Sequence, residues 1–271
     1  MPDGRRIGIA PERIRSICVS LSLGTILLLA SCRMAWAEPP IHARGFLAEQ
    51  LRYERVRVAH ARKNAALEKL LRQAGIETGD LNILLLAYKA EGVLELYAKS
   101  GAASRYRKLR SYAICQVPGN LGPKRQLGDE QVPEGFYHID RFNPRSNYLL
   151  SLGINYPNAA DKIKSRGKNP GGDIFIHGAC VSIGCLPMTD DKIQEIYLYA
   201  VHARNSGQRK IPVYIFPFRM TRANMQEYAA SNAGHPALLR FWKSLEKGYA
   251  RFSENARALP VRIDEKGEYV F

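Results

Sequence analysis

The chain of 271 residues lacks internal repeats and low-complexity tracts, and its acidic residues are few. The absence of repeats excludes a solenoid or another array of repeated units. Only 25 Asp and Glu residues stand against 40 Lys and Arg residues, so the formal net charge is +15. This charge favours anionic partners such as cell-wall polymer, acidic lipid or nucleic acid, but it does not indicate a fold.

The N-terminal apolar run is too short to span a membrane comfortably. This run, 17–30, follows several arginines and has the length of a signal-peptide core. The sequence AWA, which ends at Ala37, fits the small-x-small rule for cleavage. We therefore predict that residues 1–37 are a signal peptide and that the protein is exported to the periplasm. The alternative is lipidation at Cys32, because the sequence LASC resembles a lipobox.

Export changes both the charge of the chain and the partners that we expect for it. The first 37 residues hold five basic and two acidic residues, so the exported chain would carry a net charge of +12. Nucleic acid is then the least expected of the three anionic partners, and we predict that none is bound. The 46% hydrophobic content is sufficient for a proper core.

The pattern of apolar residues predicts an α+β fold in which a sheet carries the core. Two features set the boundaries of its elements: turn residues between short apolar runs, and a typical N-cap residue at Thr189. Helices are predicted over 44–72 and 189–205 and from residues 222 and 237, strands over 83–88, 93–98, 106–115, 135–139, 174–176 and 211–216, and a terminal hairpin over 261–271.

The sequence IHGACVSIGC, residues 176–185, places one histidine and two cysteines within ten residues. A metal site, a disulfide and a cysteine nucleophile could each use these side chains. Zinc would need His177, Cys180 and Cys185 together, but paired C-x-x-C spacing and a local fourth ligand are lacking. We therefore predict no metal at this place.

Cys185 has the surroundings of a nucleophile. It lies in a turn beside Gly184, shortly before the helix that begins after Thr189, and backbone N–H groups in such a turn can face an anion. This position is expected to lower the pKa of the thiol and to stabilise the oxyanion of an acyl-transfer intermediate. His177 ends a predicted strand and can act as the general base.

The same stretch resembles the HG…S-x-G-C signature of the L,D-transpeptidase catalytic domain, called YkuD-like, and in particular its YafK-like murein branch. Four further segments resemble this branch in the same order: LGPKRQLGDEQVPEGFY, SLGINYPNAAD, MTDDKIQEIY and IPVYIFPFR. The resemblance implies a mostly β catalytic domain with a mixed sheet over 81–219. A helical segment over 38–80 would precede it, and a helical extension with terminal strands over 220–271 would follow it.

The resemblance also implies roles for single residues. Cys185 matches the acyl-accepting nucleophile of the family, and His177 matches its general base and acid. The turn and oxyanion positions of the motif are matched by Gly178, Ser182 and Gly184.

Two residues depart from the family pattern. Ile183 stands where most members have a second histidine, and Pro187 stands where an arginine is frequent. Because peptidoglycan stem peptides present carboxylates, Lys124 and Arg125 are candidate substrate contacts. Tyr137, in a segment that resembles the P-x-G-F/Y of the family, is a further candidate.

The resemblance implies an enzyme that acts on peptidoglycan stem peptides without a cofactor, and we expect a monomer. The cysteine would form a thioester at the meso-diaminopimelate centre and pass the acyl group to an amine. Transfer to water would make the enzyme a hydrolase, either an L,D-carboxypeptidase or an enzyme that releases wall-linked lipoprotein. A non-catalytic cell-wall-binding protein is the alternative of another class, but such a protein has no reason to retain His177 and Cys185 in this spacing.

The cysteines that follow the cleavage site allow a prediction of their own. Three of them survive cleavage before Glu38, and the mechanism requires that Cys185 stays free. We therefore predict that Cys115 and Cys180 form a disulfide or lie close together.

Overall fold

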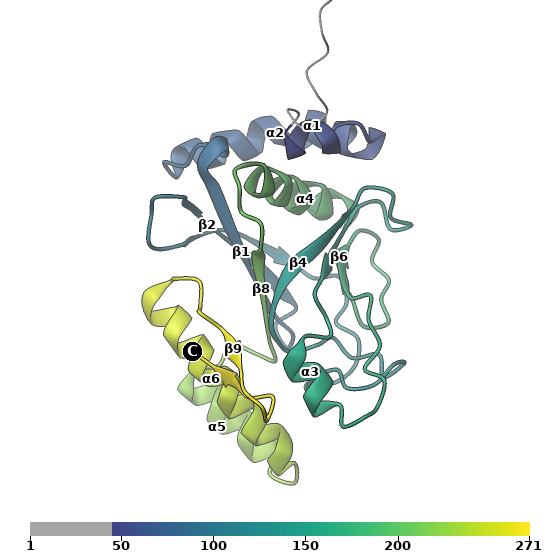
Figure 1. Ribbon diagram of the computed structural model, residues 1–271, viewed down its shortest axis with the longest axis vertical. Helices are drawn as coiled ribbons and strands as arrows, with labels where there is room; N and C mark the ends of the chain where they lie inside the picture. Colours follow the sequence, from purple (N-terminus) through teal and green to yellow (C-terminus); the bar gives the residue numbers. More distant parts are fainter. Residues whose placement is uncertain (1–44) are drawn as a thin grey trace, which may run out of the picture. The chain divides into compact units, whose positions relative to one another are not determined.

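A curled sheet organises the part of the chain that the structure describes. The computed structural model describes residues 45–271, so the predicted signal peptide lies outside the described residues. Within this range eight strands form one mixed sheet in the order β3-β2-β1-β8-β4-β5-β6-β7 (Figure 1). The strands are β1 Leu81–Tyr88, β2 Val93–Ser100, β3 Arg107–Ala113, β4 Gly135–Asn143, β5 Ser151–Ile154, β6 Phe175–His177, β7 Leu186–Pro187 and β8 Ile211–Phe216, with a separate pair of β9 Arg262–Ile263 and β10 Tyr269–Val270.

Six helices accompany the sheet in the described residues. None of them is both long and apolar enough to cross a bilayer. The mixed sheet and these helices confirm the α+β class that the sequence predicts. The helices are α1 Phe46–Gln50, α2 Glu54–Gln73, α3 Ala159–Lys164, α4 Asp190–Asn205, α5 Arg222–Ser231 and α6 Pro236–Asn255.

Strand β1 shows why the sheet needs a layer on each side. Successive residues of a strand point to opposite faces. Ile83 and Leu85 accordingly belong to one buried cluster, whereas Leu84 and Leu86 belong to the other. The strand pairs antiparallel with β2 and parallel with β8. A strand that is apolar on both faces must be covered on both, and helices supply both layers.

Helix α4 covers the first face, and α2 packs on α4 (Figure 1). The helix predicted over 44–72 is in fact two helices, because the chain turns at residues 51–53. Val56 of α2 is fully buried, and Asn64 of α2 is hydrogen-bonded to Nε2 of His202 in α4 (2.7 Å). The N-terminal segment is thus packed on α4 and contributes to the buried cluster between α4 and the sheet.

Helix α6 and the hairpin β9–β10 cover the second face. Trp242 and Leu245 of α6 are buried in a cluster with aromatic residues of the sheet such as Phe136 and Phe216. The helix approaches closely at Gly248, because a Cβ at that position would lie 2.5 Å from a ring atom of Phe136. The predicted C-terminal helices and hairpin are confirmed, and they form part of the core.

Besides the two-residue strand β7, two short elements, strand β5 and helix α3, have no counterpart among the strands and helices predicted from periodicity. Strand β5 is four buried residues paired with β4 on one side and β6 on the other. Helix α3 has only six residues and depends on a capping box, in which Asn158 and Asp161 bond to each other's backbone N–H groups. Both elements are stabilised by neighbours and caps, so an amphipathic period does not reveal them.

The sheet curls enough for its two ends to meet. Strands β3 and β7 occupy opposite ends of the strand order. Nevertheless the N–H of Cys115, just after β3, donates to the carbonyl of Pro187 in β7 (2.9 Å). The ammonium of Lys192 in α4 also donates to the carbonyl of Ala113 in β3 (2.8 Å). The curl brings the segment after β3 to the loops around β6 and β7.

A buried ion pair anchors the long connection between β3 and β4. Nζ of Lys89 lies 3.0 Å from Oε1 of Glu134, and it also donates to the carbonyls of Gly122 (2.8 Å) and Val132 (2.9 Å). The other carboxylate oxygen of Glu134 accepts from the indole N–H of Trp242 in α6 (2.9 Å). The loop is therefore fastened to the end of β1 and to the C-terminal extension at one point.

Candidate active site

Strands β6 and β7 bring the predicted nucleophile and base together at one end of the sheet. The two strands are parallel, with Ile176 opposite Leu186 and His177 opposite Pro187. Cys185 immediately precedes β7, and its Sγ accepts the backbone N–H of Phe175 in β6 (3.4 Å). Thiol and imidazole are thus carried by adjacent segments, two positions apart along the sheet.

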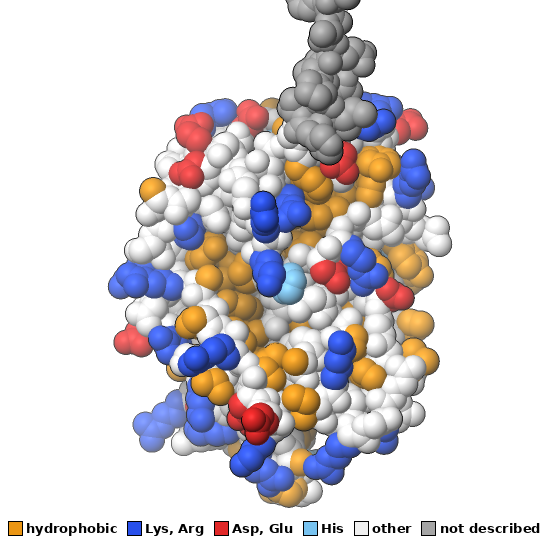
Figure 2. Space-filling view, viewed as in Figure 1, with side chains coloured by type: hydrophobic (Ala, Val, Ile, Leu, Met, Phe, Trp, Pro, Cys, Tyr) orange, Lys and Arg blue, Asp and Glu red, His pale blue; other side chains and the backbone are white. Residues whose placement is uncertain are grey.

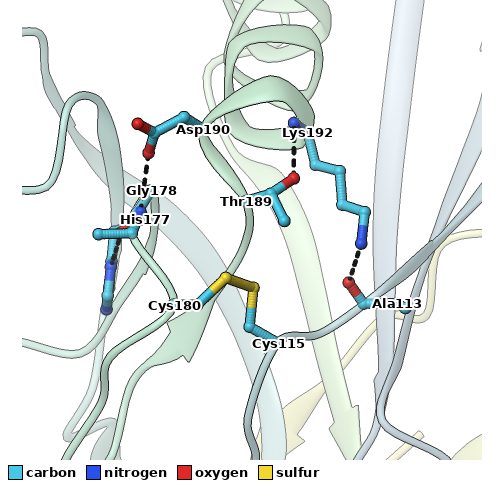
Figure 3. Close-up of a disulfide and its surroundings, with 9 residues drawn as sticks. Ala113, Cys115, His177, Gly178, Cys180, Thr189, Asp190 and Lys192 are labelled. Atoms are coloured by element: carbon cyan, nitrogen blue, oxygen red, sulfur yellow. Dashed lines mark hydrogen bonds between the residues drawn. A yellow bond between two sulfur atoms is a disulfide. The ribbon is translucent and has the colours of Figure 1, made fainter.

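His177 is held in one tautomer. Its Nδ1 lies 2.6 Å from the carbonyl oxygen of Gly178, and a carbonyl can only accept a hydrogen bond, so Nδ1 carries the hydrogen (Figure 3). The nitrogen that can accept a proton is therefore Nε2. The side chain is 2% exposed, and this burial lowers the pKa of His177 below its usual value of 6.5. The imidazole is neutral at pH 7, as a general base must be.

The loop after His177 is fixed against helix α4. The N–H of Gly178 donates to the carbonyl of Tyr148 (3.0 Å), and the N–H of Ala179 donates to Oδ1 of Asp190 at the start of α4 (2.9 Å; Figure 3). A Cβ at position 178 would lie 2.7 Å from both of these acceptor oxygens, Tyr148 O and Asp190 Oδ1. Only glycine allows this approach, which explains the residue after the histidine.

Tyr148 packs on the imidazole, and the sequence interpretation missed it. The ring centroids of Tyr148 and His177 are 4.6 Å apart, with the planes inclined by 31°, and the tyrosine is 45% exposed. Its loop is held from the N-terminal helix, because the guanidinium of Arg55 in α2 donates to the carbonyls of Ser146 and Leu149. The only signal in the sequence is an aromatic residue in a polar turn, which is too common to identify it.

The pKa of the Cys185 thiol is shifted upward, whereas the sequence predicts a lowered pKa. Burial raises the pKa of the thiol above its usual value of 9.0, and the nearby carboxylate of Asp173 acts in the same direction. The Phe175 N–H and the charge of Lys124 lower it, but they do not outweigh burial. The expected activation by the helix start is absent, since β7 and a further residue separate Cys185 from the N-cap Thr189. The resting pair is a neutral thiol and a neutral imidazole.

The turn before the cysteine is closed by Ser182. Its Oγ accepts the N–H groups of Gly184 (3.1 Å) and Cys185 (2.7 Å), and its hydroxyl donates to the carbonyl of Cys185 (3.0 Å). The two N–H groups expected to face an oxyanion are thus bonded to Ser182 in this conformation. Gly184 has a φ of +135°, which favours glycine, and Ile183 beside it is 81% exposed.

The two other cysteines of the described residues are joined. Cys115 and Cys180 form a disulfide with a Cα–Cα distance of 5.2 Å, and Cys185 is free (Figure 3). The predicted pairing is confirmed. The zinc alternative loses Cys180 as a thiolate ligand, and residues 45–271 contain no other group of three His, Cys, Asp or Glu side chains placed to hold a metal.

Two of the candidate substrate contacts, Lys124 and Tyr137, are enclosed rather than open to solvent. Lys124 is buried, and its ammonium is bound by the carboxylate of Asp129 and the carbonyl of Gln126. Tyr137 is buried as well, and its hydroxyl donates to Oδ2 of Asp161 (3.0 Å). Both residues hold the loop beside the cysteine in shape, so direct contact with a substrate is not favoured by their positions.

Comparisons with known proteins identify related sequences. The YkuD family model, described as the L,D-transpeptidase catalytic domain, matches residues 83–215. A protein of Escherichia coli K12 named "Putative L,D-transpeptidase YafK" is 40% identical over 191 residues, which cover 69% of this chain and 73% of that protein.

Two solved structures match the chain at low similarity. The helical cell shape determining protein Pgp2 of Campylobacter jejuni matches 69% of this chain and 74% of its own, with 20% identity and a TM-score of 0.41. L,D-transpeptidase 1 of Mycobacterium tuberculosis matches 50% and 62%, with 13% identity and a TM-score of 0.27. The family model and the 40% identical relative show that the chain belongs to the L,D-transpeptidase family with a YkuD catalytic domain.

Proposed function

We propose that this protein is a cysteine acyltransferase that acts on peptidoglycan stem peptides at the meso-diaminopimelate centre. The observation that carries the proposal is the state of the three cysteines in the described residues. Cys115 and Cys180 are joined, whereas Cys185 is free beside a histidine whose proton-accepting nitrogen is fixed. Family membership supplies the class of substrate.

The first half of the reaction forms a thioester. Nε2 of His177 takes the proton from the Cys185 thiol as Sγ attacks the carbonyl carbon of the L,D bond. The tetrahedral intermediate collapses when the C–N bond breaks, and His177 returns the proton to the leaving amine. Because both groups are neutral at rest, proton transfer accompanies the attack rather than preceding it.

The second half decides the type of enzyme. An amine acceptor, deprotonated by His177, attacks the thioester and gives a new peptide bond with release of the thiol. Water attacks in the same way and gives a carboxylic acid, which makes the protein an L,D-carboxypeptidase or an enzyme that releases a wall-linked lipoprotein. Transpeptidation is our leading proposal and hydrolysis is the second, and both pass through the same acyl-enzyme.

We also propose that the protein works in the periplasm after export. A disulfide between Cys115 and Cys180 supports an oxidising compartment. Intact-mass measurement of the protein isolated from cells tests the proposal. We expect a chain that begins at Glu38, or a lipidated chain that begins at Cys32. A chain that retains Met1 in a cytoplasmic pool would contradict export.

One experiment separates the proposed reactions. The exported chain is incubated with purified muropeptides, with and without an added D-amino acid, and the products and the protein are analysed by mass spectrometry. An acyl adduct on Cys185 and exchange of the D-amino acid indicate transpeptidation, whereas stem shortening alone or release of a linked peptide indicates hydrolysis. Cys185→Ala is the control. Absence of any adduct or product with the parent protein would leave the wall-binding alternative.

A further inference from the structure

A basic cavity lies where the C-terminal extension meets α3 and the loop between β3 and β4. Its volume is about 620 Å³, and its walls come from α3, α6, the turn of the β9–β10 hairpin and the loop between β3 and β4. Figure 2 shows many Lys and Arg side chains over the end of the molecule that α5 and α6 form. The lining contains one carboxylate, Glu268, against five cations: Arg125, Lys164, Arg166, Arg240 and Lys266.

Three of the five cations are not neutralised by the protein. Arg125 is paired with the buried Asp161 (2.8 Å), and Lys164 is paired with Glu268. The other three, Arg166, Arg240 and Lys266, have no carboxylate within 4.0 Å among residues 45–271. They come from three separate elements and converge on one concave surface. Like charges that share a concavity repel each other, and an anion inside it would remove this repulsion.

The chemistry of the lining favours phosphate over carboxylate. A carboxylate carries one charge and presents a planar edge that suits a single guanidinium. A phosphate group carries up to two charges and presents oxygens in several directions, so it can accept from guanidinium and ammonium donors on opposite walls. The first turn of α6, at Ala237 and Leu238, forms part of the wall and has no side-chain cap, which adds partial positive charge.

We propose that this cavity binds a phosphate-bearing anion, either a soluble phosphate ester or the headgroup of an anionic lipid. Apolar side chains give room for the organic part of such a ligand, because Ile163 and Phe241 also line the cavity. The lining includes neither Cys185 nor His177, although it does include Arg125, which the sequence names as a candidate substrate contact.

Two triple variants of the exported chain test the proposal. The cavity variant carries Arg166→Gln, Arg240→Gln and Lys266→Gln. The matched control removes the same charge from exposed positions around α2 with Arg52→Gln, Arg62→Gln and Lys69→Gln. All six side chains are exposed, so both variants should unfold at the temperature of the parent.

Binding is measured in two arms at low ionic strength. Calorimetry follows pyrophosphate, with citrate as a carboxylate of similar charge, and cosedimentation follows phosphatidylcholine vesicles with and without phosphatidylglycerol. We expect the cavity variant to bind at least tenfold more weakly in one arm, and the control to change less than twofold. Loss in the pyrophosphate arm identifies a soluble ligand, and loss in the vesicle arm alone identifies a lipid headgroup. No binding by the parent in either arm, equal weakening by both variants, or citrate bound as well as pyrophosphate would overturn the proposal.

Discussion

The buried ion pair of Lys89 and Glu134 and the proposed catalytic residues His177 and Cys185 differ in how their hydrogen-bonding capacity is used. Lys89 and Glu134 are saturated, since the ammonium has carbonyl and carboxylate acceptors and both carboxylate oxygens have donors. His177 and Cys185 are not saturated. The imidazole uses Nδ1 for the Gly178 carbonyl and leaves Nε2 to accept a proton, while Sγ has only weak contacts with backbone groups.

This difference is the one expected between a structural pair and the reactive pair that we propose. A buried charge needs partners on every side, and a pair that has them fixes the elements from which the partners come. A base and a nucleophile must keep one hydrogen-bond acceptor and one transferable proton free of other partners. Buried groups can remain unpaired in this way only when both are neutral. The shifts in pKa agree, because burial lowers that of His177 and raises that of Cys185, so neither group is charged at rest.

Removal of the reactive sulfur should have the largest effect. Cys185→Ala should abolish acyl-enzyme formation, with a loss of activity on the order of 10⁴-fold or more, because the reaction has no second nucleophile in this scheme. Stability should change little, since the replaced thiol has only weak partners. Muropeptide turnover and a thermal melt measure the two effects. Turnover at the parent rate would show that another residue is acylated.

Breaking the ion pair of Lys89 and Glu134 should mainly lower stability, whereas the loss of the Cys185 sulfur should mainly lower activity. Lys89→Met leaves Glu134 buried without its cation, which costs about 3–5 kcal/mol of unfolding free energy. Lys69→Met, on the exposed side of α2, is the matched control and should change stability by less than about 0.5 kcal/mol. Denaturant unfolding measures both, and the double variant with Glu134→Gln should recover part of the loss. A stable Lys89→Met protein would mean that the ion pair does not anchor the loop.

The two pairs also differ in how far the sequence could reveal them. His177 and Cys185 lie within one motif, so spacing and resemblance were sufficient to propose their roles, which remain predictions. The count of cysteines after the predicted cleavage site predicted the bond between Cys115 and Cys180. Lys89 looks like an ordinary lysine in a turn after a strand. Its partners come from a loop more than thirty residues away and through Glu134 from α6, and only the folded chain brings them together.

Within the site, local order was predictable and environment was not. The strand that carries His177 and the cap at Thr189 follow from local patterns. The sign of the shift in the Cys185 pKa depends on burial by segments distant in sequence, and the capture of N–H groups by Ser182 depends on the exact fold of one turn. Strand β5 was not predicted from the sequence for the same reason, because its pairing with β4 and β6 rather than its composition makes it a strand.

The pH dependence of activity tests whether the reactive pair is neutral at rest. His177 must be unprotonated to act as base, and its pKa lies below 6.5, so protonation should reduce kcat/KM only as the pH falls below about 6.5. The thiol pKa lies above 9.0, so no gain from thiolate should appear between pH 7 and 9. We expect a plateau from about 6.5 to 9, with a tenfold loss per pH unit on the acid side. A rate that climbs steadily from pH 7 to 9 would instead indicate attack by a thiolate formed without His177.

The smallest effect should come from the residue that covers the reactive pair. Tyr148 packs on the imidazole and is half exposed, so its replacement leaves no buried cavity. Tyr148→Leu removes an aromatic contact worth about 1 kcal/mol, and we expect kcat/KM to fall roughly fivefold. Water should also gain access to His177. Because burial is what lowers the pKa of His177, its pKa should rise toward 6.5, and the acid limb of the pH profile should move to higher pH.

A matched variant separates the ring from its hydroxyl. Tyr148→Phe keeps the aromatic face against the imidazole and should retain both the parent rate and the parent acid limb. The measurement is kcat/KM for a muropeptide across pH 5 to 8 in the two variants and the parent. If Tyr148→Leu lowered the rate without moving the acid limb, the ring would contact substrate rather than shield the base. If Tyr148→Phe were as impaired as Tyr148→Leu, the tyrosine hydroxyl rather than the ring would support catalysis. The proposed reactive groups would then be three, His177, Cys185 and the Tyr148 hydroxyl, instead of two.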